Sequence, residues 1–297
     1  MLGKSDTQIF FFSLVIILFI NFVAGENFKG NLTNQILLFL IPLIWPGVAH
    51  GSLDFEIAKK MGLVKNNFQT ISFFFLYITI PLIFFYLWII FPTIFFILFM
   101  VLSYLHFGIS DNLSNKNINR YFEIIIRGGV VILLPIFFHF ETTRTIFEFL
   151  LADETILVQL EKYKMFLGMF VLISIIFWLI SNLYTKGYYF LKEVILLEII
   201  LLSFCFIFFE PLISFFTYFC FLHSVRHICD EKEYLNLNFR QIIIKSLPFT
   251  IITILFFGFL YYYFAFFDYH ENMLSFVFVG LASLTTSHII LVNFTKK

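Results

Sequence analysis

The chain has 297 residues, of which 61% are hydrophobic and 13% are charged. A soluble domain would carry roughly a quarter charged residues, so this composition, with a mean hydropathy of +0.95, excludes an ordinary soluble protein. The formal net charge is zero and the sequence has no basic cluster, which argues against a nucleic-acid-binding protein.

Apolar runs separated by short polar stretches follow one another along the whole chain. A helix needs roughly 20 residues to cross a bilayer, and runs such as TIFFILFMVLSYLHFGIS approach that length. We therefore predict an all-α fold, a polytopic transmembrane helical bundle that forms a single integral membrane domain over residues 1–297. The predicted spans, about ten in number, are 8–24, 34–50, 70–90, 93–109, 122–140, 165–184, 190–209, 211–229, 247–267 and 273–294.

The first span, 8–24, has a second interpretation. Lys4, the apolar run and the following AGEN are also typical of a cleaved signal peptide. We favour a retained first helix, because Asn21 interrupts the run and the small-residue cleavage pattern is imperfect.

The positive charges are distributed unevenly between the two sides of this layout. Most Lys and Arg residues fall on the side of the N-terminus, and Arg127 lies inside the fifth span. The opposite side receives Lys29, Arg144, Lys162 and Lys164. By the positive-inside rule, both termini are predicted to be cytoplasmic, in a multi-pass protein of the cell inner (plasma) membrane.

Four of the 7 histidines fall at the predicted cytoplasmic ends of three spans. His50 ends the second span, His106 lies near the end of the fourth, and His223 and His227 close the eighth. Residues four apart share a helix face, so His223 and His227 can point at one centre. Neutral imidazole is a good ligand for iron, zinc and copper, and the pattern predicts a metal site on these four side chains.

Other polar residues accompany the four histidines. Asp54 follows His50 and Asp111 follows His106, and carboxylates close to ligand histidines commonly fix the orientation of the imidazole. Arg226 lies between His223 and His227, where it either anchors an acid or serves as an ordinary positive-inside arginine. For His139 and His270, on the opposite side, we predict no site. The histidines alone leave the choice between iron, copper and zinc open.

Three segments, GVAHGSLDFEIAKKMG, YLHFGISD and LHSVRH, in this order and at these span ends, resemble the Brp/Blh family of membrane β-carotene 15,15′-dioxygenases. The resemblance covers most of the chain, over residues 40–297. It implies that Fe(II) is held by His50, His106, His223 and His227. The later segment LTTSHIILV looks like a further family motif and implies that His288 lies in the outer shell of the iron. Asp54, Asp111 and Arg226 are the other candidates for this outer shell, because of their positions next to the ligand histidines. Ala49, Phe55 and Ser287 depart from the usual family residues, which bears on the shape of the pocket.

The resemblance further implies a non-heme iron dioxygenase that cleaves the central double bond of β-carotene with O₂ and gives two all-trans retinal molecules. In this family the retinal commonly serves a microbial rhodopsin. Tyr104, one turn before His106, is a more speculative candidate for stabilising a cationic polyene intermediate. Two alternatives stay open: a non-catalytic membrane protein for retinal delivery or rhodopsin assembly, and a metal- or proton-coupled transporter. A di-iron desaturase is disfavoured, because the chain has one H-x-x-x-H pair where such enzymes carry several histidine boxes.

Overall fold

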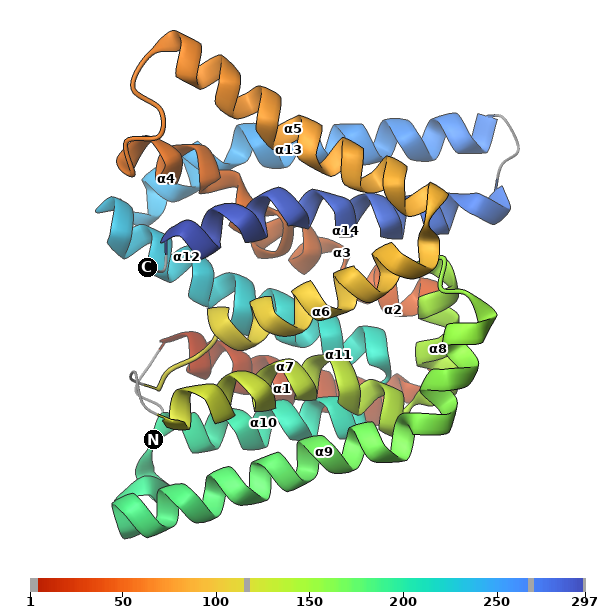
Figure 1. The fold of residues 1–297 in the computed structure, drawn as a ribbon, viewed down its shortest axis with the longest axis vertical. Coiled ribbons are helices and arrows are strands. Elements are labelled where there is room, and N and C mark those ends of the chain that lie inside the picture. Colours follow the sequence, from red (N-terminus) through yellow and green to blue (C-terminus); the bar gives the residue numbers. More distant parts are fainter. Residues whose placement is uncertain (1–4, 115–117, 267–269, 296–297) are drawn as a thin grey trace. The chain divides into compact units, whose positions relative to one another are not determined.

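A computed structural model of the chain describes residues 5–114, 118–266 and 270–295, and every regular element in this part is helical (Figure 1). The all-α prediction is therefore confirmed. The α-helices are α1 (Ser5–Ala24), α2 (Leu32–Leu38), α3 (Leu40–Pro42), α4 (Asp54–Lys60), α5 (Asn67–Ile90), α6 (Pro92–Ser110), α7 (Ile118–Phe138), α8 (Phe140–Phe149), α9 (Glu154–Lys186), α10 (Val194–Phe208), α11 (Pro211–Tyr218), α12 (Ser224–Leu235), α13 (Phe239–Phe266) and α14 (His270–Thr295). Short 3₁₀ or π turns are η1 (Gly25–Asn27), η2 (Leu43–Gly47), η3 (Val48–Leu53), η4 (Gly187–Lys192) and η5 (Phe219–His223).

Within the described residues, 8 helical segments are long and apolar enough to cross a membrane. The predicted second span corresponds to a pair of helical segments, Leu32–Leu38 and Leu40–Lys60, bent by 61°. Proline explains part of this break: Trp45, which precedes Pro46, has the extended angles φ −148° and ψ 120°, because the proline ring disfavours a helical residue before it. The predicted seventh span corresponds to the shorter α10. The number of spans and the cytoplasmic location of both termini stay predictions.

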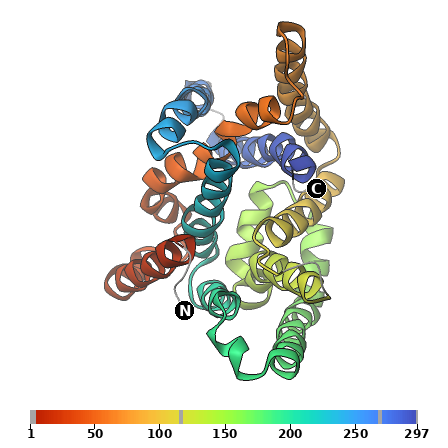
Figure 2. The ribbon, with the colours of Figure 1, turned by 90° about the vertical axis from the view of Figure 1, so that its left-hand side faces the viewer.

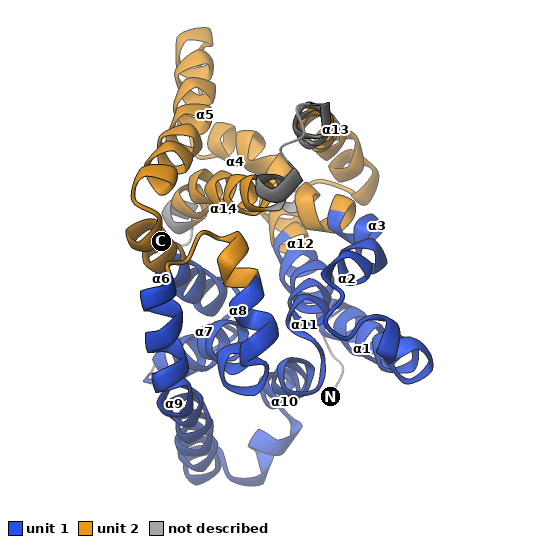
Figure 3. Cartoon of the chain, turned by 90° about the vertical axis from the view of Figure 1, so that its right-hand side faces the viewer, with its two compact units in different colours: residues 1–43, 100–145, 154–227 blue, residues 44–99, 146–153, 228–297 orange. Residues whose placement is uncertain are grey.

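The chain divides into two compact units (Figure 3). Unit 1 comprises residues 1–43, 100–145 and 154–227, and unit 2 comprises residues 44–99, 146–153 and 228–297. Three of the divisions fall within α6, α8 and α12, one falls within η2, and one lies directly before α9. The assignment of the chain to a single integral membrane domain stays a prediction.

In unit 1, α7 packs against α9 and α10, and α1 packs against α10, α11 and η5 (Figures 1 and 2). Glycine permits the close approach of α6 and α7. A Cβ atom on Gly128 would lie 2.3 Å from the Tyr104 carbonyl oxygen, and one on Gly108 would lie 2.4 Å from the Ile124 carbonyl oxygen. Small residues at such crossings let membrane helices approach closely, and this crossing fixes the end of α6 that carries His106.

Helix α1 presents an apolar outer face and a more polar inner face. Phe12, Phe19 and Phe22 are exposed, whereas Asp6 and Thr7 are buried in unit 1. An outward apolar face is suited to lipid, and buried polar groups in such a helix need partners inside the protein. The polar face of α1 therefore predicts a specific contact within unit 1.

In unit 2, α14 packs against α5 and α4, and α13 packs against η3. The Ser287 hydroxyl donates a hydrogen bond to the Tyr77 carbonyl at 2.9 Å, which ties α14 to α5. A buried cluster of Leu53, Ile228 and Ile242 joins η3 to α12 and α13. These contacts fix the segment that carries His50 and Asp54.

Candidate metal centre

Three of the four predicted ligand histidines lie together in unit 1, and all three are buried. The ring centroids of His106 and His223 are 5.2 Å apart. The rings of His223 and His227 are 6.5 Å apart and nearly parallel, with an interplanar angle of 2°. His223 ends the π turn η5, and single π turns inside helices are frequent at functional sites.

Asp111 holds the His223 ring. Both carboxylate oxygens of Asp111 lie 3.3 Å from His223 Nδ1, and the Tyr218 hydroxyl donates to Oδ2 at 2.5 Å. Burial raises the pKa of the Asp111 carboxyl, whereas His223, Arg226 and the Tyr218 hydroxyl lower it. Together the three lowering effects are larger than that of burial, so the pKa lies well below its usual range. An ionised carboxylate only accepts hydrogen bonds, so it favours the tautomer with a hydrogen on Nδ1 and an unprotonated Nε2, which is the form that binds a metal.

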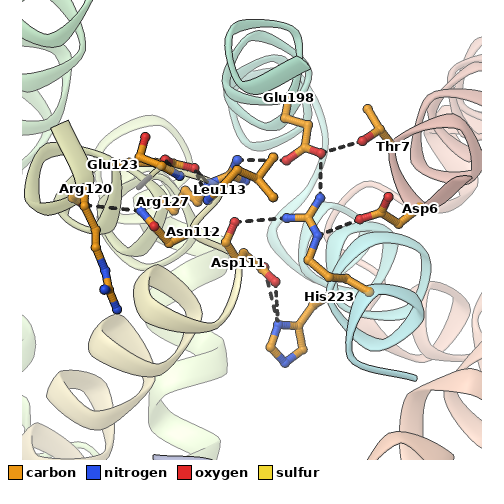
Figure 4. A network of polar contacts seen from close by, with 12 residues as sticks. Asp6, Thr7, Asp111, Asn112, Leu113, Arg120, Glu123, Arg127, Glu198 and His223 are labelled. Carbon is orange, nitrogen blue, oxygen red and sulfur yellow. Dashed lines mark hydrogen bonds and ion pairs between the residues drawn. The ribbon is translucent and has the colours of Figure 1, made fainter. Parts of the chain in front are cut away.

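The contact between Asp111 and His223 continues into a buried network of polar contacts that includes Glu198 and Asp6 (Figure 4). Arg226 belongs to this network through three hydrogen bonds. Its Nη1 donates to the Asp111 carbonyl oxygen at 3.0 Å, its Nε to Asp6 Oδ2 at 2.6 Å and its Nη2 to Glu198 Oε1 at 2.5 Å. Arg226 thus connects α12 to α1, to α10 and to the residue that follows α6. An uncompensated charge in such a place costs several kcal/mol, and the two carboxylates compensate this one.

The same network extends to the start of α7. Arg127 donates to Glu198 Oε2 at 2.8 Å and to Glu123 Oε1 at 2.7 Å. The Glu123 carboxylate in turn accepts from the backbone N–H groups of Leu113 and Ser114, both at 2.9 Å. The segment that follows α6 is therefore held through both its carbonyl and its amide groups.

Aromatic rings surround His223 within unit 1. The ring centroids of Phe107 and Phe219 lie 5.1 Å and 5.8 Å from that of His223, and Phe219 is stacked on the imidazole. Phe215 lies next to both of these phenylalanines. The histidine cluster therefore has an apolar lining on at least one side, which suits an apolar ligand.

Unit 2 contains a second histidine held by a carboxylate. Asp54 Oδ2 lies 2.9 Å from His288 Nδ1, and the Tyr77 hydroxyl donates to the same oxygen at 2.5 Å. A Cβ atom on Gly51 would lie 3.6 Å from His288 Nδ1, so η3 runs close beside this ring. The backbone of His50 belongs to η3, but its side chain lies outside the described residues.

The structure pairs the acids and histidines differently from the sequence spacing. Spacing associates Asp111 with His106 and Asp54 with His50, whereas in space Asp111 lies against His223 and Asp54 against His288. In both cases the histidine and the acid are remote from each other in sequence.

Two other residues considered in the sequence have ordinary contacts. The Tyr104 hydroxyl donates to the Ile125 carbonyl at 2.8 Å, which links α6 to α7, and its role toward a polyene stays a prediction. His139 Nε2 lies 3.0 Å from the Ile207 carbonyl oxygen. The side chain of His270 lies outside the described residues.

Several residues around the histidines were not identified from the sequence. Glu198 interrupts an apolar run, and Glu123 and Arg127 are four apart within the fifth predicted span. Ionisable residues inside membrane segments are costly and usually functional, so this signal could have identified all three. Tyr77 and Tyr218 carried no comparable signal, because tyrosine is common throughout this aromatic-rich chain.

The imidazoles of unit 1 have the donor chemistry that suits a transition metal such as Fe(II). Imidazole is a preferred ligand of iron, zinc and copper, and the Nε2 atoms of His223 and His227 are both shielded from solvent. With its Nδ1 against Asp111, His223 has the carboxylate–histidine arrangement that is usual for metal ligands. His106 adds a third imidazole to the same cluster.

Comparison with known proteins supports one family. The family described as beta-carotene 15,15′-dioxygenase matches residues 41–296. A protein named beta-carotene 15,15′-dioxygenase from uncultured marine bacterium 66A03 is 29% identical over 259 residues, which cover 85% of this chain and 90% of that protein. No solved structure matches the chain.

Proposed function

The chain belongs to the beta-carotene 15,15′-dioxygenase family, and from this premise we propose that it cleaves the central double bond of β-carotene with O₂. The double bond breaks, each of its two carbons receives one oxygen atom, and the products are two all-trans retinal molecules. The observation that carries this proposal is the family match itself, which extends over residues 41–296 and so includes every predicted metal ligand.

For the metal, we propose Fe(II) on His106, His223 and His227, with His50 as the fourth ligand on the basis of the sequence. Bound Fe(II) would supply the redox chemistry through which O₂ reacts with the polyene. Asp111 would keep the His223 ring in the orientation and tautomer that a ligand needs. Asp54 and His288 keep their proposed places in the outer shell.

The apolar surroundings of His223 support a polyene substrate. β-Carotene has no polar group, so its recognition depends on apolar contact and shape, and Phe107, Phe215 and Phe219 provide aromatic surface next to the histidine. A membrane location also suits this substrate. β-Carotene is dissolved in the bilayer, so an enzyme embedded there does not have to transfer it into water.

The test is retinal formation in β-carotene-producing bacterial cells that express the wild-type chain, His223→Ala or His139→Gln. The last variant is a control that keeps a side-chain donor for the Ile207 carbonyl. We expect retinal from the wild type and the control, and none from His223→Ala at equal membrane abundance, as measured by HPLC. Undiminished retinal in His223→Ala would overturn the metal centre. No retinal from an iron-loaded wild type would favour the non-catalytic or transporter alternatives.

A further inference from the structure

Helix α1 lies before the region matched by the family, yet it contributes two polar side chains to the interior of unit 1. Asp6 is 6% exposed and Thr7 is 0% exposed. Asp6, Phe10, Ser13 and Ile17 follow one another at helical spacing and are all buried. Asp6 and Thr7 lie at the end where α1 begins.

Both polar side chains contact the charged network directly (Figure 4). Asp6 Oδ2 accepts from Arg226 Nε at 2.6 Å. The Thr7 hydroxyl donates to Glu198 Oε1 at 2.5 Å, and Arg226 Nη2 donates to the same oxygen. Helix α1 therefore fixes the Arg226 guanidinium from two directions, by an ion pair and through Glu198.

Arg226 transmits this restraint to the ligand histidine. Its Nη1 donates to the carbonyl oxygen of Asp111, and the carboxylate of the same residue lies against His223 Nδ1. Glu123 in addition accepts from the amides of Leu113 and Ser114. The backbone at Asp111 and in the residues that follow it is thus held by buried charged groups.

This arrangement is costly if its purpose is stability alone. Desolvation of a buried ion pair offsets most of its Coulomb attraction, and an apolar replacement of similar volume is often as stable. A planar guanidinium with several fixed donors is, in contrast, well suited to fixing the direction of a neighbouring group. The three donors of Arg226 go to Asp6, Glu198 and the Asp111 carbonyl, which come from three different parts of unit 1.

We infer that Asp6 is a positioning residue of the metal centre: through Arg226 and Asp111 it sets the orientation in which His223 binds the metal. The inference rests on the proposed function in one respect, that His223 is a metal ligand. The inference also gives α1 a role in positioning the metal centre, although α1 lies outside the region matched by the family.

The test is a Co(II) titration of the full-length, metal-free protein in detergent, followed by its visible absorption, which reports both affinity and ligand geometry. The variants are Asp6→Asn, Asp6→Glu and the control Glu26→Gln, an acid-to-amide change at an exposed position after α1. Removing an outer partner of a metal ligand typically lowers metal affinity about 10–100-fold. We expect Asp6→Asn to be near the lower end of this range, about 10-fold, with shifted bands. Asp6→Glu should recover most of the affinity, and Glu26→Gln should match the wild type.

Unchanged affinity and unchanged bands in a folded Asp6→Asn protein would overturn the inference. If Asp6→Asn does not accumulate in membranes, Thr7→Val takes its place, because it removes only the hydrogen bond to Glu198. A weaker Co(II) affinity of Thr7→Val supports the inference, and an unchanged affinity overturns it. The titration does not depend on carotenoid chemistry. A wild type that binds Co(II) but forms no retinal would therefore defeat the proposed function without defeating this inference, and a wild type that binds no Co(II) would defeat the inference.

Discussion

Unit 1 and unit 2 each hold a buried aspartate between a tyrosine hydroxyl and a histidine Nδ1. In unit 1 these residues are Tyr218, Asp111 and His223, and in unit 2 they are Tyr77, Asp54 and His288. The surroundings differ. The backbone of Asp111 is bound by the arginine of a charged network, whereas Tyr77 is stacked on Phe73 and Phe55 lies against Phe73 and Phe74. The same local arrangement is thus supported by ion pairs as well as aromatic rings in unit 1 and by aromatic packing in unit 2.

This difference has a chemical consequence. Replacing the unit 1 carboxylate by an amide removes a charge beside Arg226 and leaves His223 with only a neutral acceptor, so two interactions change together. The corresponding replacement in unit 2 leaves His288 with only a neutral acceptor and leaves the aromatic packing in place. The two units should therefore respond unequally to equivalent substitutions.

The largest effect is expected for Asp111→Asn. Loss of the charged acceptor for His223 should lower metal affinity about 100-fold, the upper end for such partners, and retinal formation should fall with it. Iron content of the purified protein and retinal in carotenoid-producing cells would measure both. Wild-type iron content in this variant would remove the argument for a carboxylate-held ligand in unit 1.

Gly128→Ala should act on the packing of unit 1 and not on its chemistry. The added methyl would meet the Tyr104 carbonyl oxygen, and overpacking of this kind costs about 1–3 kcal/mol. We expect a lower unfolding temperature in detergent. Gly258→Ala in α13 is the matched control, because a Cβ there meets nothing within 4 Å. Equal unfolding temperatures for the two variants would contradict the close α6–α7 approach.

Asp54→Asn should give a smaller loss of retinal formation than Asp111→Asn, about 10-fold, the lower end for partners of metal-site residues. The reason is that only the contacts of the Asp54 carboxylate with His288 and with the Tyr77 hydroxyl are weakened, while the aromatic contacts around Tyr77 remain. Parallel assays of the two variants at matched membrane abundance measure the ratio. A larger loss of retinal formation in Asp54→Asn than in Asp111→Asn would contradict the expected order of the two units.

The smallest and most similar effects are expected for Tyr218→Phe and Tyr77→Phe. Each removes one hydroxyl 2.5 Å from a carboxylate oxygen, and a hydrogen bond to a charged group contributes about 1.5–3 kcal/mol, most of which we expect to appear as lost stability. Retinal formation per folded protein should therefore fall only about 3-fold in each. Thermal unfolding together with the retinal assay separates the two contributions. A strong effect in one variant alone would show that the two hydroxyls have different functions.

The helices and the candidate ligands could be predicted from the sequence. Apolar run length decides the helical class, because a segment in lipid must satisfy its own backbone groups, and the i, i+4 spacing of His223 and His227 determines that their rings share a face. The bend near Pro46 and the small size of α10 were missed, since mean hydropathy is insensitive to a break within an apolar run.

The sequence by itself thus determined the helical membrane class, the His223–His227 pair and the family, because these depend on local periodicity and on motifs read within short segments. Only the tertiary structure decided that Asp111 lies against His223, that Asp54 lies against His288 and that Asp6 of α1 holds Arg226. Such pairings join side chains that are far apart along the chain. They depend on how helices pack, through close approaches such as that at Gly128, and no spacing within a single helix encodes them.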